Sequence, residues 1–486
     1  MHKSILTSAK VILVFVAAMF TLNAQAQQTD STQTDTTVVE ESSEATSSFS
    51  TFELEPEDTT QQTIGKMYND IEFLKRFQIS GYFQGQFQWA DSSGIASASG
   101  GNFSPGIDKR FSVRRGRLKV TYDKYFSKVV FQTDMTERGL RVVEAYASIT
   151  EEKFYWATLT AGIFNRPFGY EIEYTSNMRE APERGRMSGN LFPNERDLGA
   201  KVTIQGPKFG IWNWLKLDVA MVTGVGSEDA NVGISDYDKR KDLITHLTVN
   251  RANRNEDIKY GFGVSYYDGG VIFNIDSTKK VASYVLNEDS AGIKTFHVDS
   301  VAPDSYAPRK YYGIDAQFQK DFKWGIFTLK AEYIQGTHSS QGSTTKAYQS
   351  KPTASNPVYI RKFNGAYFEL AQNFNRPTSE NKFLNTIYSI IPGQIVVKYD
   401  WYDPNTEVKG DEIGKNVTSG ATGRKTTNAT DLRYDTFGFG VAYFLSNNAK
   451  VLAYYDMVTN ETSKNLSGYT QDLKDNVFTL RLQYKF

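Results

Sequence analysis

The stretch Arg110–Met135, RFSVRRGRLKVTYDKYFSKVVFQTDM, decides the fold of this chain. It reads as two strands joined by a turn at Lys124–Ser127. Because successive side chains of a strand point to opposite faces, the first strand has an apolar face and a basic face. The two faces carry Leu118, Val120 and Tyr122, and Arg115, Arg117, Lys119 and Thr121, respectively. In a soluble sheet the basic face meets water outside, whereas in an outer-membrane barrel the apolar face meets lipid and the basic face lines a water-filled lumen.

The rest of the chain favours the barrel. In Gln78–Ala90, large apolar residues such as Phe83 and Trp89 alternate with polar ones, and fifteen later segments alternate in the same way. Sixteen is an even number, as is usual for bacterial single-chain barrels. The sequence therefore predicts an all-β fold, a transmembrane antiparallel β-barrel of about 16 strands over residues 78–486. The competing interpretation is a soluble β protein with Phe83, Leu118 and Leu480 in a dry interior.

The linkers between these segments support the same fold. They alternate between long and short, as expected for long extracellular loops and short periplasmic turns. Gly269–Arg309 is the longest of them. Two linkers break the alternation, because Thr136–Leu140 is short on the outer side and Asn375–Pro392 is long on the inner side. A soluble sandwich or solenoid has no reason to alternate in this way.

Three segments precede the predicted barrel. A positively charged start, the apolar run Val11–Leu22 and the cleavage site Ala24–Ala26 predict a signal peptide over residues 1–26. Residues 27–63 are acidic and rich in Ser and Thr, which predicts a disordered segment. In residues 64–77, apolar side chains recur at three- and four-residue steps, as in a short amphipathic helix, although a linker is nearly as plausible.

Residues for covalent or metal chemistry are scarce. The chain has no cysteine and four histidines, and it contains no G-x-S-x-G, H-E-x-x-H or Walker motif. His246 lies in the middle of a predicted strand among polar residues, which indicates a lumen-lining residue rather than a catalyst. We therefore expect no enzyme activity, no cofactor, no metal site and no nucleic-acid partner. Two alternatives stay open, an outer-membrane barrel enzyme and a plugged adhesive or structural barrel without an open channel.

Several short motifs carry a family likeness. They are Arg114-Arg115-Gly116-Arg117, Gln132 with Asp134, Glu144-Ala145-Tyr146, Gly162, Arg166-Pro167-Phe168-Gly169-Tyr170-Glu171, Glu183-Arg184 and Arg196-Asp197-Leu198-Gly199. With the closing segment Asn476–Phe486 and its terminal aromatic residue, they resemble the phosphate-selective porin O and P family. The resemblance implies a sixteen-stranded barrel in the outer membrane of a Gram-negative bacterium, usually a homotrimer. It also implies that the third long loop folds inward to narrow the channel.

Seven cations are the candidate pore-lining and anion-binding residues: Arg115, Arg117, Lys119, Arg166, Arg184, Arg196 and Lys201. The first three share one strand face at steps of about 6–7 Å, between which an anion could move. Alternatively, these charges only solvate the lumen and pair with acids such as Asp134 and Glu144. The loop Phe164–Arg196 holds five Arg and five Glu, so its zero net charge argues against strict phosphate selectivity.

The function expected from these features is a porin with a water-filled channel. Small hydrophilic solutes would cross it by passive diffusion, with a preference for anions such as phosphate. The expected partners are outer-membrane lipid, small anionic solutes and further copies of the chain in a homotrimer.

Overall fold

The computed structural model describes residues 73–207, 210–225, 236, 238–274, 280–348, 351–374, 393–415 and 423–486. All of them belong to the unit Lys66–Phe486. Four predicted segments lie outside these residues: the signal peptide, the acidic segment, residues 64–72 of the helix or linker, and the long linker Asn375–Pro392.

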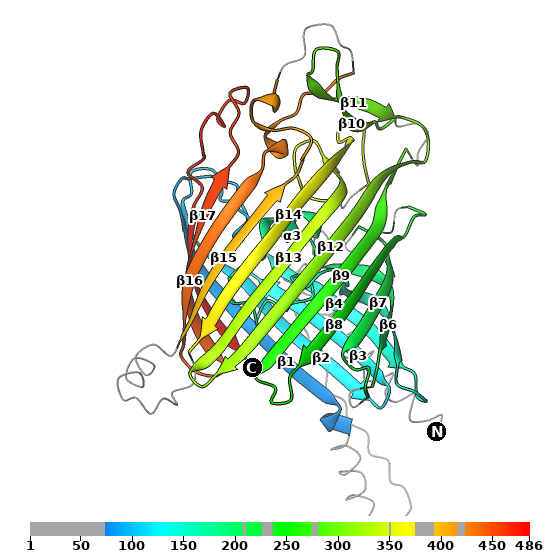
Figure 1. Cartoon of the computed structure of the whole chain (residues 1–486), viewed down its shortest axis with the longest axis vertical. Helices are drawn as coiled ribbons and strands as arrows, with labels where there is room; N and C mark the ends of the chain where they lie inside the picture. Colours follow the sequence, from blue (N-terminus) through cyan, green and yellow to red (C-terminus); the bar gives the residue numbers. More distant parts are fainter. Residues whose placement is uncertain are drawn as a thin grey trace, which may run out of the picture. The chain divides into compact units, whose positions relative to one another are not determined.

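Sixteen strands of the described chain form a closed antiparallel barrel (Figure 1). Strands that follow one another along the chain are paired, β9 is paired with β12, and β18 pairs with β1 to close the wall. The wall strands are β1 Phe77–Ala90, β2 Lys109–Lys124, β3 Ser127–Thr136, β4 Gly139–Thr150, β5 Ala157–Asn165, β6 Arg196–Gln205, β7 Leu215–Val222, β8 Asp242–Ala252, β9 Ile258–Phe273, β12 Ser305–Phe322, β13 Gly325–Gln341, β14 Val358–Asn373, β15 Gly393–Asp403, β16 Tyr434–Phe444, β17 Ala449–Asn460 and β18 Val477–Lys485. The predicted fold class is confirmed.

The longest predicted linker, Gly269–Arg309, contains strands of its own. β10 Ser283–Glu288 and β11 Lys294–Ser300 form an antiparallel hairpin above the upper rim in Figure 1. β10 also runs parallel to the start of β14, and the pairing of β9 with β12 continues into the linker. These strands pair with each other and with the rim rather than facing lipid, so they lack the regular apolar alternation of the wall.

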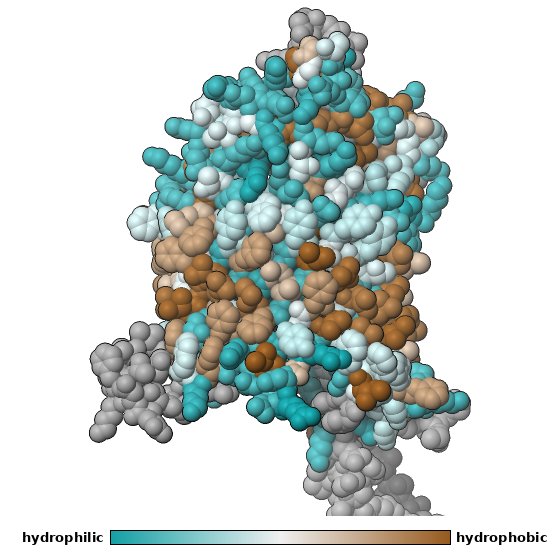
Figure 2. Space-filling view, in the orientation of Figure 1, coloured by the Kyte–Doolittle hydropathy of each residue, from teal (hydrophilic) through white to brown (hydrophobic). Residues whose placement is uncertain are grey.

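The outer surface of the wall is apolar. In β16, the outward side chains are Phe437, Phe439, Val441 and Tyr443, which are 42–49% exposed. The intervening Gly438 and Gly440 are buried, and a Cβ atom at either position would come within 2.4 Å of the Tyr454 ring or its hydroxyl. Figure 2 shows the resulting hydrophobic band between two hydrophilic ends of the wall.

The exposure of this band shows whether the apolar side chains face lipid or pack in a dry protein interior. Phe83 is 44% exposed and Leu480 is 41% exposed, so neither side chain lies in a protein core. Their polar neighbours along the strands, such as Gln84 and Arg481, are buried inside the barrel instead. A closed barrel that is apolar outside and polar inside is the arrangement of an outer-membrane barrel.

Helices are short in the described part of the chain. They are α3 Arg186–Leu191 and the single 3₁₀ turns η1 Gly410–Glu412 and η2 Ala429–Asp431, beside the first described residues Phe73–Lys75. Among these residues, no helix is long and apolar enough to cross a membrane.

The third long loop, residues 166–195 between β5 and β6, folds into the barrel. It contacts the wall on several sides, because Ser176 Oγ lies 2.6 Å from Tyr82 Oη of β1 and the amide of Gly169 donates to Ser265 Oγ of β9 at 2.9 Å. The amide of Arg186, at the start of α3, donates to Asp400 Oδ1 of β15 at 3.0 Å. The predicted inward fold of this loop is confirmed.

An aromatic cluster fixes this loop to one side of the lumen. Phe168 and Phe192 of the loop pack against Tyr267 of β9, Tyr311 of β12 and Phe363 of β14, and all five side chains are at most 2% exposed. The Phe168 and Phe192 ring centroids lie 5.1 Å apart, within the range of favourable aromatic pairs. The loop therefore fills the lumen beside β9, β12 and β14 with apolar side chains.

Candidate functional site

A cavity of about 1370 Å³ lies between the third loop, the upper parts of β2 and β4, and the outer loops. We call it the basic cavity, because ten basic and three acidic residues line it. The basic residues are Arg114, Arg115, Arg117, Arg138, Arg141, Arg184, Arg186, Arg196, Lys346 and Lys474. The acidic residues are Glu183, Glu195 and Asp475.

A β-bulge in β2 brings two consecutive arginines into the lumen. Gln84 of β1 faces Arg115, but Gly85 faces Val113, so Arg114 is the extra residue. A bulge re-aims a side chain that would otherwise point to the opposite face. Arg114 Nε and Arg115 Nη2 consequently both reach the carboxylate of Glu183 in the third loop, at 2.8 and 3.1 Å.

A second irregularity lies between β3 and β4. Gln132 faces Glu144, and Thr133 faces Val142, so Val143 is the extra residue. This register places Arg141 Nη2 3.5 Å from Asp134 Oδ2, and Arg117 Nε approaches the same oxygen at 3.4 Å. Asp134 is 2% exposed, so it holds the two guanidiniums beside each other at the cavity wall.

Two more arginines of the cavity come from the third loop and its end. Arg184 Nη2 lies 2.9 Å from Glu195 Oε1, and Arg196 pairs with the same carboxylate. Arg196 Nη2 also lies 3.1 Å from Glu144 Oε1 of β4. The loop is therefore tied to the wall by ion pairs on the basic side and by aromatic packing on the other.

The charges of the third loop are separated in space. Three of its five glutamates point away from the basic cavity, because Glu171 pairs with Lys398 of β15 at 2.5 Å, Glu173 with Lys216 of β7 at 3.6 Å, and Glu180 with Lys330 of β13. The zero net charge of the loop therefore does not describe the charge that a solute meets. Three of the loop's five arginines line the basic cavity, Arg184, Arg186 and Arg196, together with only two of its five carboxylates.

The two loop glutamates in the cavity are ionised. Burial alone would raise the pKa of Glu183, but the guanidiniums of Arg114, Arg115 and Arg481 outweigh burial and hold this pKa well below its usual range. Burial also acts on Glu195, whose pKa is held well below its usual range chiefly by Arg184.

The seven residues predicted from the sequence fall into two groups. Arg115, Arg117, Arg184 and Arg196 come together on the basic cavity. The other three do not line it: Lys119, Arg166 and Lys201. Lys119 pairs with Glu144 at 3.2 Å and keeps 35% of its side chain exposed, and Lys201 lies 3.7 Å from Asp218 with 17% exposed. Both stay on the inner side of the wall.

Arg166 differs most from the expectation. Its side chain is 2% exposed and its Nη2 lies 2.7 Å from Asp197 Oδ2, which is itself buried. Because this pair is out of reach of solvent, Arg166 holds the start of the third loop against β6 rather than facing a solute.

The sequence missed other residues of the site. Strict alternation placed Arg114 on the lipid face, and only the bulge brings it inward. Arg141 and Arg186 were not singled out, although the basic loop sequence around Arg186 was visible. The inward residue Tyr267 directly follows Tyr266, and the inward residue Tyr311 directly precedes Tyr312. The sequence does not reveal which tyrosine of each pair points inward.

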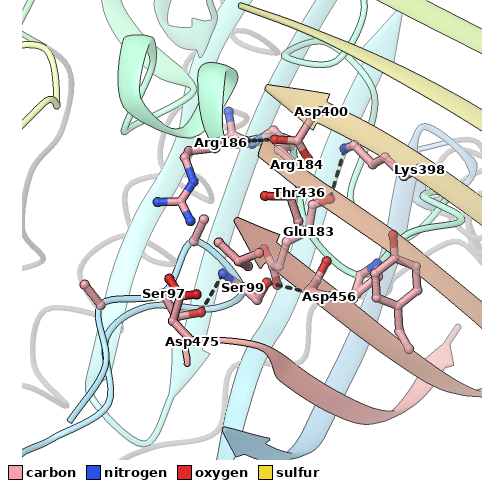
Figure 3. A pocket seen from close by; sticks show the side chains of 15 residues that line it. Ser97, Ser99, Glu183, Arg184, Arg186, Lys398, Asp400, Thr436, Asp456 and Asp475 are labelled. Carbon is pink, nitrogen blue, oxygen red and sulfur yellow. Dashed lines mark hydrogen bonds between the residues drawn. The ribbon is translucent and has the colours of Figure 1, made fainter. Parts of the chain in front are cut away.

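A small polar pocket of about 20 Å³ adjoins the basic cavity and shares Glu183, Arg184, Arg186 and Asp475 with it (Figure 3). Ser99 Oγ of the first outer loop donates to Asp456 Oδ2 of β17 at 2.6 Å. Figure 3 shows the Arg186 side chain directed away from Asp400 and toward Asp475. Asp400, Asp456 and Asp475 thus gather in this pocket together with Arg184, Arg186 and Lys398.

Comparisons with known proteins add structures of similar fold. Neither a family model nor a curated protein matches the chain. Solved structures that match include the outer-membrane channel DcaP of Acinetobacter baumannii, with 11% identity, a TM-score of 0.46, and coverage of 84% of this chain and 97% of that chain. An anion-selective porin from Comamonas acidovorans matches with 9% identity, a TM-score of 0.45, and coverage of 84% and 99%. OmpT of Vibrio cholerae, in its trimer form, matches with 10% identity, a TM-score of 0.44, and coverage of 84% and 99%.

One expectation from the sequence is corrected here, namely that the chain is not an enzyme. The matching barrels include several forms of OmpT beside the porins, and this mixed set does not indicate a non-enzyme. A shared fold does not fix an activity. The resemblance to the phosphate-selective porin O and P family stays a prediction. The predicted localisation, the outer membrane of a Gram-negative bacterium, is confirmed, because the chain forms a closed β-barrel with an apolar outer band.

Proposed function

We propose that the chain forms a water-filled channel through which small hydrophilic solutes diffuse, and that this channel prefers anions such as phosphate. The basic cavity is the observation that supports the preference, because ten of its thirteen charged lining residues are cations. A cleft lined by one sign of charge raises the local concentration of ions of the opposite sign. Guanidinium groups also match the geometry of carboxylate and phosphate oxygens.

The proposed path continues along the inner wall below the cavity. Arg115, Arg117 and Lys119 occupy alternate positions of β2, about 6–7 Å apart. Lys201 of β6 and Lys216 of β7 keep part of their side chains exposed on the inner side of the wall. Each of these cations is paired with a carboxylate, so an anion would bind weakly at each step, as conduction requires. We therefore propose a moderate anion preference rather than a phosphate filter.

The proposed partners are outer-membrane lipid, small anionic solutes and two further copies of the chain. The exposed apolar band supports the contact with lipid. The homotrimer rests on the family resemblance of the sequence, and mass measurement of the detergent-solubilised protein tests it.

Recording from the purified full chain in a planar bilayer tests the channel. We expect stepwise conductance, and under a KCl gradient we expect a reversal potential of the sign set by chloride. Reversal toward the potassium potential would contradict the anion preference while leaving the channel in place. Absence of conductance steps would contradict the channel itself.

A plugged barrel is the second candidate function, and the aromatic cluster inside the lumen favours it. Phe168, Phe192, Tyr267, Tyr311 and Phe363 close off the part of the lumen beside β9, β12 and β14. If this packing extends across the remaining space, the barrel has a structural or adhesive role. The same bilayer recording separates the two candidates.

A further inference from the structure

The basic cavity has a second wall of different chemistry. Tyr434 at the start of β16, together with Tyr469 and Leu473 of the last outer loop, lines the cavity, and all three are half-buried. We call these three residues the tyrosine patch. Tyr434 and Tyr469 pack against a core made of Val408, Ile413 and Leu432, so the patch has a firm support. Around the barrel, β17, β18 and β1 separate the tyrosine patch from the arginines of β2.

Arg186 stands next to this patch and differs from the other arginines of the cavity. The centre of its guanidinium lies 4.1 Å from the Tyr434 ring centroid. Among the described residues, each of the other seven arginines that line the cavity has a carboxylate within 4.0 Å, and Arg186 has none. Its Nε is buried and finds no hydrogen-bond acceptor in the described chain. Asp475, toward which the side chain is directed, lies beyond that distance, so the arginine of the cavity without an ion pair is the one beside aromatic side chains.

Two kinds of solute contact therefore meet at one place. A carboxylate can pair with the Arg186 guanidinium without first displacing an acidic side chain. A flat apolar ring can cover Tyr469 and Leu473, which would otherwise present apolar surface to water. Inorganic phosphate and acetate can use only the first contact, because they have no ring. The cavity is large enough for a small organic anion to turn and to leave again.

We propose that the basic cavity binds organic anions in which a planar apolar ring lies next to a carboxylate, with the ring on the tyrosine patch and the carboxylate on Arg186. This inference rests on the proposed function and narrows its solute class. The binding is weak, since a channel must release its solute to conduct. Ring-bearing carboxylates would be held longer in the cavity than simple anions of equal charge.

The experiment uses the full chain in lipid nanodiscs, with benzoate and acetate as the probes. Saturation-transfer NMR measures which benzoate protons contact the protein, and titration gives the Kd of each probe. We expect benzoate to bind roughly three- to tenfold more tightly than acetate, the size of one aromatic contact. Tyr469→Ser should raise the Kd of benzoate by a similar factor and leave that of acetate unchanged. Arg186→Gln should raise both.

Matched controls are Tyr312→Ser, on the lipid face of β12, and Arg254→Gln, in the exposed turn after β8. Neither should change either Kd. Equal Kd values for benzoate and acetate, or no effect of Tyr469→Ser in a folded barrel, would overturn the inference. The KCl reversal potential is measured separately on the same preparation. Anion preference without tighter benzoate binding would reject the inference and retain the proposed function. Tighter benzoate binding without conductance would reject the proposed channel and retain the inferred binding of ring-bearing carboxylates.

Discussion

Arg115 Nη2 of β2 lies 3.1 Å from Glu183 Oε2 of the third loop, and both side chains are at most 10% exposed. Arg114 and Arg481 of β18 bind the same carboxylate, so three guanidiniums from two wall strands converge on one loop residue. Glu183 consequently has two effects on the basic cavity. It holds the loop against the wall, and it neutralises part of the positive charge that a solute would meet.

Glu183→Gln should increase anion preference. The change removes one negative charge from the cavity and leaves three guanidiniums without their shared carboxylate. One unit charge at 4 Å in water is worth about 1 kcal/mol, so we expect the anion-to-cation permeability ratio to rise by up to about fivefold. The KCl reversal potential measures this ratio. Glu152→Gln, which removes the same charge from the exposed turn after β4, is the control. An unchanged ratio in Glu183→Gln would show that solutes do not pass this carboxylate.

The regular part of the fold was predictable from the sequence because lipid imposes a simple rule on it. Side chains that face the hydrocarbon must be apolar, so the period of two is visible along strands such as β1 and β16. The rule fails where strands meet protein instead of lipid. β10 and β11 pair above the rim, and the inward Tyr267 and Tyr311 meet the third loop, so neither shows the lipid pattern.

The candidate site was predictable only in part, because bulges and pairing depend on three-dimensional contacts. Alternation placed Arg115 and Arg117 in the lumen correctly, but one extra residue in β2 added Arg114. The zero net charge of the third loop was read correctly from the sequence, yet it did not predict the basic cavity. Glu171, Glu173 and Glu180 are drawn to lysines of three other strands, and nothing local in the sequence indicates those partners.

Arg117→Glu should lower anion preference. The side chain is 5% exposed at the cavity wall, and a glutamate there would stand beside Asp134 as a second negative charge. Reversing one charge changes the local charge by two, so the permeability ratio should shift toward cations by at least the factor expected for a single charge. The reversal potential measures the shift, and Arg254→Glu in the exposed turn after β8 is the control. If both variants behave like the unaltered protein, β2 does not border the path.

Phe168→Ala should loosen the third loop without opening the barrel wall. Phe168 is 0% exposed and packs against Phe192, Tyr267 and Tyr311, so the truncation leaves a cavity worth about 3–5 kcal/mol. The wall strands keep their hydrogen bonds. We therefore expect larger and noisier single-channel currents, together with faster tryptic cleavage after the loop arginines.

The same truncation outside the lumen serves as its control. Phe154→Ala lies in the turn after β4, where Phe154 is 70% exposed, and it should change neither current nor cleavage. Unchanged cleavage in Phe168→Ala would mean that the ion pairs of Glu183 and Glu195 hold the loop alone.

Leu480→Arg should impair insertion of the barrel. Leu480 faces outward on β18 and pairs with Phe87 of β1 at the strand junction that closes the barrel. An arginine on the lipid face costs about 2–4 kcal/mol at the bilayer midplane. The fraction that folds into lipid vesicles, read from heat-sensitive migration in gels, should fall. Gln319→Arg, which adds the same group on the lumen side of β12, should fold normally, and equal folding of the two variants would speak against a lipid-facing β18.

Acidification should increase anion preference through Asp475. This carboxyl lies in the loop before β18, lines the basic cavity and is 4% exposed. Burial raises its pKa to about 6, while Arg186 lowers it and Asp472 adds to the rise. Because the pKa is raised, the group is ionised at pH 7.5 and becomes neutral as the pH falls below 6. Glu183 and Glu195 keep their charge in this range, since their arginine partners hold both pKa values low.

The KCl reversal potential measured between pH 7.5 and pH 5 follows this titration. We expect a shift toward the chloride potential with a midpoint near pH 6, because one negative charge leaves the cavity. Asp475→Asn should show the acidic value at every pH, whereas Asp472→Asn, an exposed neighbour in the same loop, should retain the titration. A pH-dependent shift that persists in Asp475→Asn would assign the titration to another group, and Asp456 beside Ser99 would be the next residue to replace.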